Sequence, residues 1–276
     1  MSSFVKFLII AGICILFMAV FFRDGDKADS IRVSGSTTLE PFIRKAVNEY
    51  NKKSGLSITI SAPGSMSGID ALIFGECDIA MSSARILPDQ SIRAEKEGVL
   101  LKPFLLGYDI IVPIVNRENP VVNISLNQLK DIYRGKIKNW SELGGNDAEI
   151  EIVSRKNNSG TYCAFCRIIA PAGETLSMVR VSNSSVLAYI AENVNAIGYI
   201  SSSYLNPEVK ALVVDGVDIF DKEGQRNDHP IKRPLYLYVD KNKFTGPVKS
   251  FVLFIVLNEQ MKALFPKSGF YPSAAE

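Results

Sequence analysis

The sequence predicts an α/β protein with largely parallel sheets, and three observations lead to this fold class. Short β-branched segments alternate with stretches in which apolar residues recur at helical spacing. Turns rich in Gly, Ser and Thr separate the predicted strands from the helices that follow them. The chain has 276 residues, which at roughly 150 residues per domain suits one large or two modest domains. We therefore expect a globular body built from strand–turn–helix units.

The chain begins with an apolar segment over residues 7–22, followed by polar residues 23–27. A signal-peptide core spans about 7 to 15 residues and a membrane-spanning helix about 17 to 25, so the segment lies between these classes. No A-x-A pattern follows it, and Ile13 precedes Cys14, where a lipoprotein cleavage site needs Gly or Ala. We predict that residues 1–30 form an uncleaved hydrophobic anchor helix and a polar tether. A cleaved signal peptide is the alternative, a buried core helix is least favoured, and both favoured cases place the remainder outside the cytoplasm.

Strand–turn–helix units recur along the folded part. The first two have their strands, turns and helices at residues 31–33, 35–38 and 39–50, and at 56–60, 62–68 and 69–74. The third has a strand over 150–153, a polar turn over 154–161 that contains Arg155, and a helix over 162–169. The other predicted elements are a strand over 78–81 with the polar turn 82–85, a long apolar strand over 104–115, a helix over 126–133, strands over 196–200 and 234–239, and a closing helix over 248–265.

Charge and residue usage exclude several functions. The chain has 31 Lys and Arg against 29 Asp and Glu, a net charge of +2, which is too little to hold a nucleic acid. His229 is the only histidine, so no mechanism can use two imidazoles, and Asp228-His229-Pro230 is predicted to be a turn. Residues 64–68 resemble a nucleophile elbow, but Met66 stands where the serine is needed. No P-loop or metal-ligand spacing occurs, so we expect neither an enzyme nor a cofactor or metal site.

Cys163 and Cys166 form a C-x-x-C pair, a spacing found in redox pairs and in halves of zinc sites. There is no second C-x-x-C and no nearby His, which favours a structural or incidental role for both cysteines. An oxidising compartment would allow a disulfide between them.

The polar turns predict an anion site. In α/β sheets a ligand lies outside the carboxyl ends of the strands, where loops lead into helix N-termini. Those termini present unpaired N–H groups and the positive end of the helix dipole. Helix capping explains any one turn alone. Three such turns, together with the permanently charged fork of Arg155, predict a cage for a small tetrahedral oxyanion.

Five segments resemble, in order, the PstS-type phosphate-binding proteins of bacterial ABC importers. They are Gly-Ser-Thr-Thr-Leu-Glu-Pro at 35–41, Asp-Ile-Ala-Met-Ser-Ser-Ala-Arg at 78–85, Ser-Arg-Lys-Asn-Asn-Ser-Gly-Thr at 154–161, Asn-Ala-Ile-Gly-Tyr at 195–199 and Arg-Pro-Leu-Tyr-Leu-Tyr-Val at 233–239. The resemblance covers nearly all of residues 31–272. It implies a periplasmic-binding-protein (type II) fold, in which two α/β lobes joined by two crossing strands close on one phosphate.

By the same resemblance, residues 31–107 and 234–276 form lobe 1 and residues 108–233 form lobe 2. The hinge is expected at Gly107-Tyr108 and Pro234-Leu235. The implied function is the capture of inorganic phosphate outside the cytoplasm by a monomeric receptor that delivers it to the permease subunits of an ABC importer.

The resemblance also implies the phosphate ligands. Lobe 1 provides hydroxyl and main-chain donors from three turns, and lobe 2 provides the arginine and a helix N-terminus. The predicted ligands are Ser36, Thr37, Thr38, Leu39, Ser65, Ser83, Arg155, Ser159, Gly160 and Thr161.

Two positions depart from the well-known members. Ser83 stands where they have an aspartate that accepts a proton from phosphate and repels sulfate. Asn157 stands where they have an aspartate that orients the arginine. A hydroxyl can both donate and accept, so Ser83 does not by itself ensure discrimination between phosphate and sulfate.

Three other functions stay open. One is a receptor or membrane-bound sensor for another oxyanion such as sulfate, and another is a phosphatase with a serine nucleophile. The third is a lobe pair that binds nothing and has a structural role. The single His and the lack of metal ligands disfavour the phosphatase, and the intact Arg155 and Ser159-Gly160-Thr161 disfavour the structural pair.

Overall fold

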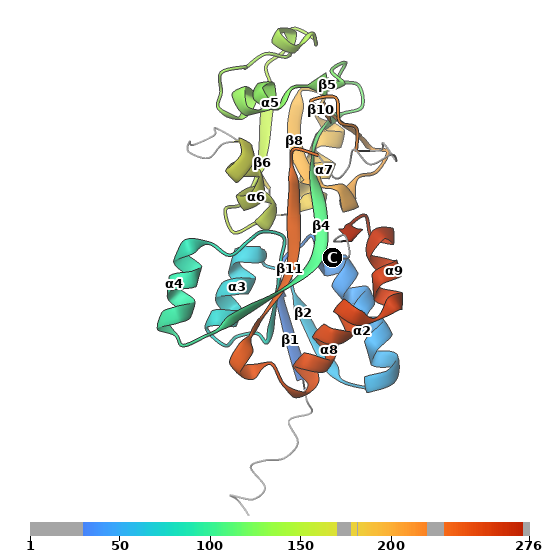
Figure 1. Cartoon of the computed structure of the whole chain (residues 1–276). Coiled ribbons are helices and arrows are strands. Elements are labelled where there is room, and N and C mark those ends of the chain that lie inside the picture. Colours follow the sequence, from blue (N-terminus) through green and yellow to red (C-terminus); the bar gives the residue numbers. More distant parts are fainter. Residues whose placement is uncertain (1–29, 170–177, 181, 220–228, 273–276) are drawn as a thin grey trace, which may run out of the picture.

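The computed structural model describes residues 30–169, 178–180, 182–219 and 229–272. They form two lobes, one below and one above the centre of Figure 1, and two long strands run through both. These strands are β4 (Leu101–Asn116) and β11 (Lys232–Asp240). The predicted N-terminal hydrophobic helix lies outside the described residues. Among the residues that are described, no helix is long and apolar enough to cross a membrane.

The lower lobe contains helices on both faces of its strands (Figure 1). Its elements are β1 (Ser30–Gly35), α2 (Glu40–Ser54), β2 (Ser57–Ser61), α3 (Ser65–Ile73), β3 (Ile79–Ser82), α4 (Pro88–Lys96), η5 (Lys241–Lys243), α8 (Gly246–Leu257), α9 (Glu259–Lys267) and β12 (Tyr271–Pro272). The elements of the upper lobe are β5 (Asn123–Ile124), α5 (Leu126–Tyr133), η2 (Trp140–Leu143), β6 (Glu151–Arg155), α6 (Gly160–Ile169), β7 (Met178–Arg180), α7 (Asn183–Glu192), β8 (Ala196–Ser201), η3 (Ser202–Tyr204), β9 (Val209–Ala211) and β10 (Val213–Val214).

The main sheet is mixed and runs β2-β1-β3-β11-β4-β8-β6-β7, with β9 and β12 also paired to β4. Its outer strands are parallel: β1 pairs β2 and β3, and β6 pairs β7 and β8. The central pairs β3-β11, β11-β4 and β4-β8 are antiparallel. The prediction of mainly parallel sheets is therefore correct only for the outer strands. The two crossing strands run in opposite directions between the lobes, which places antiparallel pairs at the centre.

The crossing strands pair where the hinge was predicted. Leu235 is opposite Gly107, and Pro234 is opposite Tyr108. At Gly107, whose φ is 149°, a Cβ would lie 2.3 Å from the carbonyl oxygen of Tyr271. This close approach requires glycine. The division of the chain into lobes at these residues stays a prediction.

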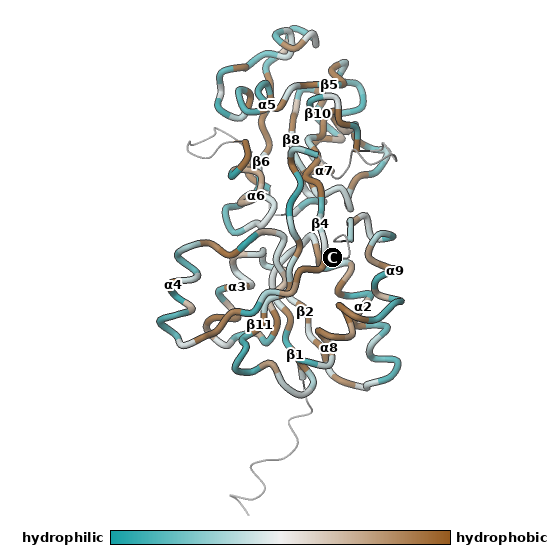
Figure 2. Tube along the Cα trace, in the orientation of Figure 1, coloured by the Kyte–Doolittle hydropathy of each residue, from teal (hydrophilic) through white to brown (hydrophobic). Residues whose placement is uncertain are grey.

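Helix α2 shows how the sequence sets the lower lobe. Pro41 lies in its first turn, and the left-handed Gly55, with φ 65°, ends it. Phe42 and Ile43 lie on its buried face, in a core with residues of β1, β3, β11, α8 and α9. The hydrophobic residues of α8 stand out in Figure 2. The predicted helix over 39–50 is confirmed and extended to Ser54.

The closing helix predicted over 248–265 is wrong in one respect, because it is two helices. Asn258 separates α8 from α9, and its Oδ1 accepts hydrogen bonds from the N–H groups of Gln260 and Met261. The apolar spacing continues on both sides of this cap, so it does not reveal the break.

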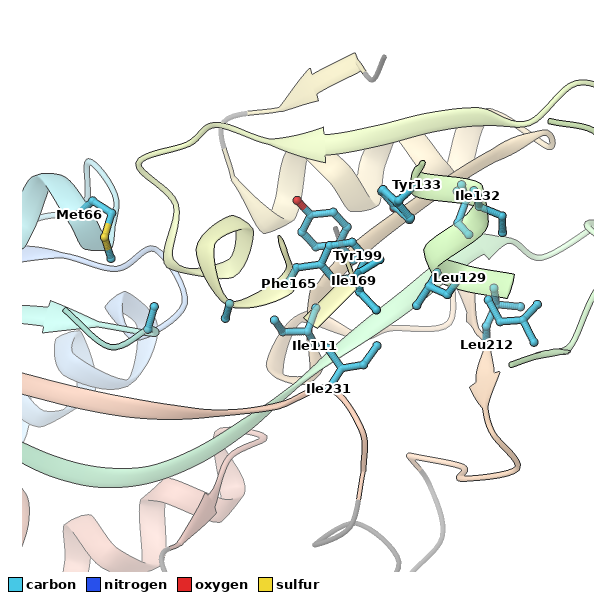
Figure 3. Close-up of a cluster of buried hydrophobic side chains, with 14 of the residues drawn as sticks. Met66, Ile111, Leu129, Ile132, Tyr133, Phe165, Ile169, Tyr199, Leu212 and Ile231 are labelled. Carbon is cyan, nitrogen blue, oxygen red and sulfur yellow. The ribbon is translucent and has the colours of Figure 1, made fainter. Parts of the chain in front are cut away.

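Three aromatic side chains, Tyr133, Phe165 and Tyr199, pack together in the core of the upper lobe (Figure 3). Phe165 stacks on Tyr199 with ring centroids 3.8 Å apart, and Tyr133 meets both rings edge-on. The hydroxyl of Tyr199 leaves this core, bonds Ser154 Oγ at 2.9 Å and accepts from the N–H of Arg155 at 3.3 Å. The core thus fixes the end of β6, where the predicted anion ligands begin.

Candidate anion-binding site

The first predicted turns meet at the carboxyl ends of three parallel strands. The N–H of Gly64 donates to the carbonyl of Gly35 at 2.9 Å, and the N–H of Ser36 donates to the carbonyl of Met81 at 2.8 Å. Gly35 has φ 138°, and a Cβ there would lie 2.1 Å from the Met81 oxygen. Only glycine permits this approach, which brings β1, the start of α3 and the end of β3 together.

Three predicted ligands form a cluster, which we call the serine cluster: Ser36, Ser65 and Ser83. The Oγ atoms of Ser36 and Ser83 are 3.1 Å apart, and those of Ser65 and Ser83 are 3.3 Å apart. The N–H of Ser83 donates to Oγ of Ser65 at 3.1 Å. All three residues are at most 2% exposed. Three turns that are separate in sequence therefore contribute one group of hydroxyls.

The start of α6 in the upper lobe lies against the serine cluster. A Cβ at Gly160 would be 2.3 Å from Oγ of Ser65 and 2.6 Å from Oγ of Ser83. Oγ of Ser159 accepts from the N–H of Tyr162 at 3.4 Å, and Ser159 and Thr161 are buried. The predicted ligands of the upper lobe thus face those of the lower lobe, and Gly160 allows the contact.

Asn158 bridges the lobes beside this contact. Its Nδ2 donates to the carbonyl of Pro63 at 2.9 Å and to Oγ of Ser67 at 3.0 Å. Its carbonyl accepts from the N–H of Met66 at 3.1 Å. The lobes are therefore closed on each other in this structure. The sequence analysis did not identify Asn158, because an Asn in a polar turn is common.

Arg155 is buried at the end of β6, as an anion ligand of the upper lobe would be. Its Nη1 donates to Oδ1 of Asn183 at 3.0 Å, and its Nη2 donates to Oγ1 of Thr37 at 3.4 Å. Burial lowers the pKa of the guanidinium to about 10, and the positive charge of Arg233 acts in the same direction. A bound anion would oppose both effects, so the surroundings of Arg155 favour a negative charge.

A different residue from the expected one orients this arginine. Asn157, at the position where related proteins have an aspartate, is exposed, and its carbonyl accepts from Sγ of Cys163 at 3.3 Å. Asn183, the first residue of α7, contacts Arg155 instead. Nothing in the local sequence marks Asn183, because it follows Ser182 in an ordinary helix cap.

The sequence analysis also missed a buried ion pair, Arg233–Asp109. Nε and Nη2 of Arg233 donate to Oδ2 of Asp109 at 2.9 and 2.6 Å, and both side chains are at most 1% exposed. Nη1 also donates to Oγ of Ser83, and Nη2 to Oγ1 of Thr38, each at 3.2 Å. Asp109, the single charge in the predicted apolar strand over 104–115, was the available signal. Buried charges are rare unless they are paired.

Other predicted residues have separate surroundings. The side chain of Leu39 packs in the core of the lower lobe, and its carbonyl accepts from the N–H of Ile43 at 2.9 Å, so its N–H is the group that a ligand would meet. His229 is buried, burial lowers its pKa to about 4, and its Nδ1 accepts from the N–H of Ile231 at 3.2 Å. Cys163 and Cys166 are free thiols. Across the described ranges, no three His, Cys, Asp or Glu side chains are grouped as a metal site.

The site thus combines buried hydroxyls from both lobes with two guanidinium groups and a helix N-terminus. Such donors stabilise oxygen atoms that carry negative charge. The arrangement suits reversible binding of a small oxyanion.

Comparison with known proteins gives consistent results. A family model described as a PBP superfamily domain matches residues 23–259. The phosphate-binding protein PstS of Bacillus subtilis is 30% identical over 249 residues, which cover 88% of this chain and 80% of that protein. A crystal structure of a phosphate ABC transporter substrate-binding protein from Clostridium perfringens, with bound phosphate, is 34% identical. It has a TM-score of 0.81 and covers 89% of this chain and 100% of that one. An ABC-type phosphate transport receptor from Vibrio cholerae has 27% identity and a TM-score of 0.72, with 88% and 100% covered.

Proposed function

This chain belongs to the PstS-type phosphate-binding proteins of the PBP superfamily, and from that premise we propose how it works: inorganic phosphate binds between the lobes, and the closed receptor delivers it to an ABC importer. The serine cluster, Thr37, Thr38 and the Leu39 main chain are the ligands from the lower lobe. Arg155, Ser159, Gly160 and Thr161 are those from the upper lobe.

One observation carries this proposal. Arg155, from the upper lobe, and the serine cluster, from the lower lobe, are all buried, and Gly160 lies against two of the cluster's hydroxyls. A charge-assisted hydrogen bond contributes about 1.5 to 3 kcal/mol, and micromolar affinity requires about 8 kcal/mol. A handful of these donors is sufficient after the cost of closing the lobes.

Closure and release need no chemical step. Bending at the crossing of β4 and β11 opens the cleft, and phosphate then draws Arg155 and the α6 terminus onto the serine cluster. The Asn158 bridge forms in the same movement. We propose that the receptor acts as a monomer outside the cytoplasm, held there by residues 1–30 as an anchor or exported by them as a signal peptide.

Calorimetric titration of the full chain in detergent, stripped of bound anion, tests this function. The native chain should bind phosphate, and Arg155→Gln should weaken binding more than about 100-fold, because several charge-assisted bonds are lost. Arg167→Gln, at an exposed arginine of α6, is the matched control and should leave the affinity unchanged. No heat with phosphate, or equal affinity in both variants, would overturn the proposal.

A further inference from the structure

We propose that Arg233, held by Asp109, is a positioning residue that turns the hydroxyl protons of the site toward the ligand, so that the site prefers the dianion of a tetrahedral oxyanion to its monoanion. The inference rests on the proposed function and concerns the form of phosphate that is bound.

Asp109 cannot accept a proton from the ligand, because both of its oxygens are already occupied. Oδ2 accepts two bonds from Arg233, and Oδ1 accepts from the hydroxyls of Ser201 and Ser202 at 2.9 Å each. These four donors fix the carboxylate and therefore fix the fork of Arg233. The remaining donor capacity of the fork is directed at Thr38 and Ser83.

Thr38 must donate to the ligand. Its Oγ1 accepts from Nη2 of Arg233 at 3.2 Å and from Nδ2 of Asn183 at 3.1 Å. The amide of Asn183 cannot be reversed, because its Oδ1 accepts from Arg155 and from the N–H of Ser201. A hydroxyl oxygen has two lone pairs. Both are used at Thr38, so this hydroxyl is left only with its proton to offer.

The hydrogen bond from Arg233 also fixes the direction in which the Ser83 hydroxyl donates. Its Oγ accepts from Nη1 of Arg233 and from the Ser36 hydroxyl, so its own proton goes to Ser65 or to the ligand. Oγ of Ser65 already accepts from the N–H of Ser83. If it also accepts the Ser83 proton, its lone pairs are filled and it donates in turn. By either route the chain of bonds that begins at Arg233 ends in a donor.

Thr38 and the Ser83–Ser65 pair therefore present protons and not lone pairs, whereas Ser36 gives its proton to Ser83. A proton on a phosphate oxygen that faces them finds no acceptor, whereas an unprotonated oxygen is stabilised by each of them. Serine at position 83 alone could accept, and the contact with Arg233 removes that option. The selectivity thus follows from Arg233, which lies on the crossing strand β11.

The titratable groups around Arg233 do not obscure this effect. Asp109 on β4 is its ion-pair partner, and Arg155 at the end of β6 has a pKa of about 10. Burial raises the pKa values of Tyr199 and Tyr204, whose charges also act on Arg155. None of these three pKa shifts makes its group titrate near neutral pH. The pH profile of binding near neutrality should then report the protonation of the ligand.

Titrating the full chain with phosphate and with sulfate, at pH values on both sides of the second ionisation of phosphate, tests the inference. For the native chain, affinity for total phosphate should rise with the dianion fraction, while affinity for sulfate stays constant. Equal affinity for the two ionic forms of phosphate would overturn the inference without any mutation. A failure of the native chain to bind phosphate at all would instead overturn the proposed function.

The double variant Asp109→Asn/Arg233→Gln gives the second test, because it replaces the ion pair by neutral amides and leaves no unpaired buried charge. Thermal melting checks its fold. Dianion affinity should fall about 10- to 100-fold. The fall should be smaller for the monoanion, because Thr38 and Ser83 regain a lone pair, so the preference for phosphate over sulfate should increase. Arg85→Gln, at an exposed arginine two residues after Ser83, should change nothing. An equal loss for both anions at every pH would show that Arg233 does not orient the hydroxyls.

Discussion

Arg155 in the upper lobe donates from Nη2 to Oγ1 of Thr37 in the lower lobe at 3.4 Å. Both partners are predicted phosphate ligands, so the bond joins the two halves of the site. A charged group from one lobe thereby contacts a neutral hydroxyl from the other. Ligand affinity and lobe closure should consequently change together when residues at this boundary are replaced.

Gly160→Ala should prevent the lobes from closing fully. The added Cβ would lie 2.3 and 2.6 Å from the hydroxyls of Ser65 and Ser83, and such overpacking costs about 1 to 3 kcal/mol. We expect calorimetry to show phosphate affinity about 5- to 100-fold lower. Gly135→Ala, in the upper lobe, has open space around the new Cβ but φ 68°. It should lower the melting temperature without changing affinity. Unchanged affinity in Gly160→Ala would show that the contact is not part of the bound state.

Asn158→Ala should weaken phosphate binding about 2- to 10-fold, because it removes the bonds to Pro63 and Ser67 that connect the lobes. Small-angle scattering should show a larger open fraction at subsaturating phosphate. Asn157→Ala is the matched control, since Asn157 is the neighbouring residue and is exposed. If Asn157→Ala had the larger effect, the exposed position would be the one that supports Arg155.

Stability should fall on acidification as a result of His229. Burial lowers its pKa from 6.5 to about 4, so between these values the unfolded chain binds a proton that the folded chain does not. The free energy of unfolding therefore decreases as pH falls through this window, by up to about 3 kcal/mol. Urea unfolding at several pH values measures the slope. His229→Asn, whose side-chain oxygen can accept from Ile231, should reduce it, and an unaltered slope would place the effect elsewhere.

Cys163 and Cys166 should react slowly with iodoacetamide at neutral pH. Burial raises the pKa of the Cys163 thiol to about 11 and also raises that of Cys166, and only the thiolate is nucleophilic. For Cys163 we expect a rate at least about 100-fold below that of the urea-unfolded chain, and for Cys166 a lower rate than in the unfolded chain, both measured by mass spectrometry. Fast alkylation of the folded chain would mean that both thiols are more accessible than in this structure.

The parts of the site that lie within one turn could be predicted, and those that depend on tertiary contacts could not. Ser36, Ser65 and Arg155 belong to polar turns between a strand and a helix, where composition carries the signal, whereas Ser83 was expected only from the family resemblance. Asn183 and the Arg233–Asp109 pair reach the site from helix α7 and from the crossing strands. The sequence neighbours of Asn183 and Asp109 carry no anion-binding signal, and the family resemblance of the segment that begins at Arg233 assigned no role to this arginine.

The same distinction applies to the fold. Apolar spacing predicted α2, because one face of that helix is buried. It failed at Asn258, where a side-chain cap interrupts an apolar pattern that continues beyond it. It also gave no strand direction, because alternation of residues along a strand is the same in parallel and antiparallel pairs. The antiparallel centre follows from the two crossings, which are a property of the whole chain.

The 16 residues of β4 belong to the sheets of both lobes. If either lobe melted alone, it would remove a paired strand from the other and expose backbone groups that need partners. Despite having two cores, the molecule should therefore lose its structure as one cooperative unit, in a single transition. Bending at the crossing can separate the lobes, but neither lobe unfolds independently of the other.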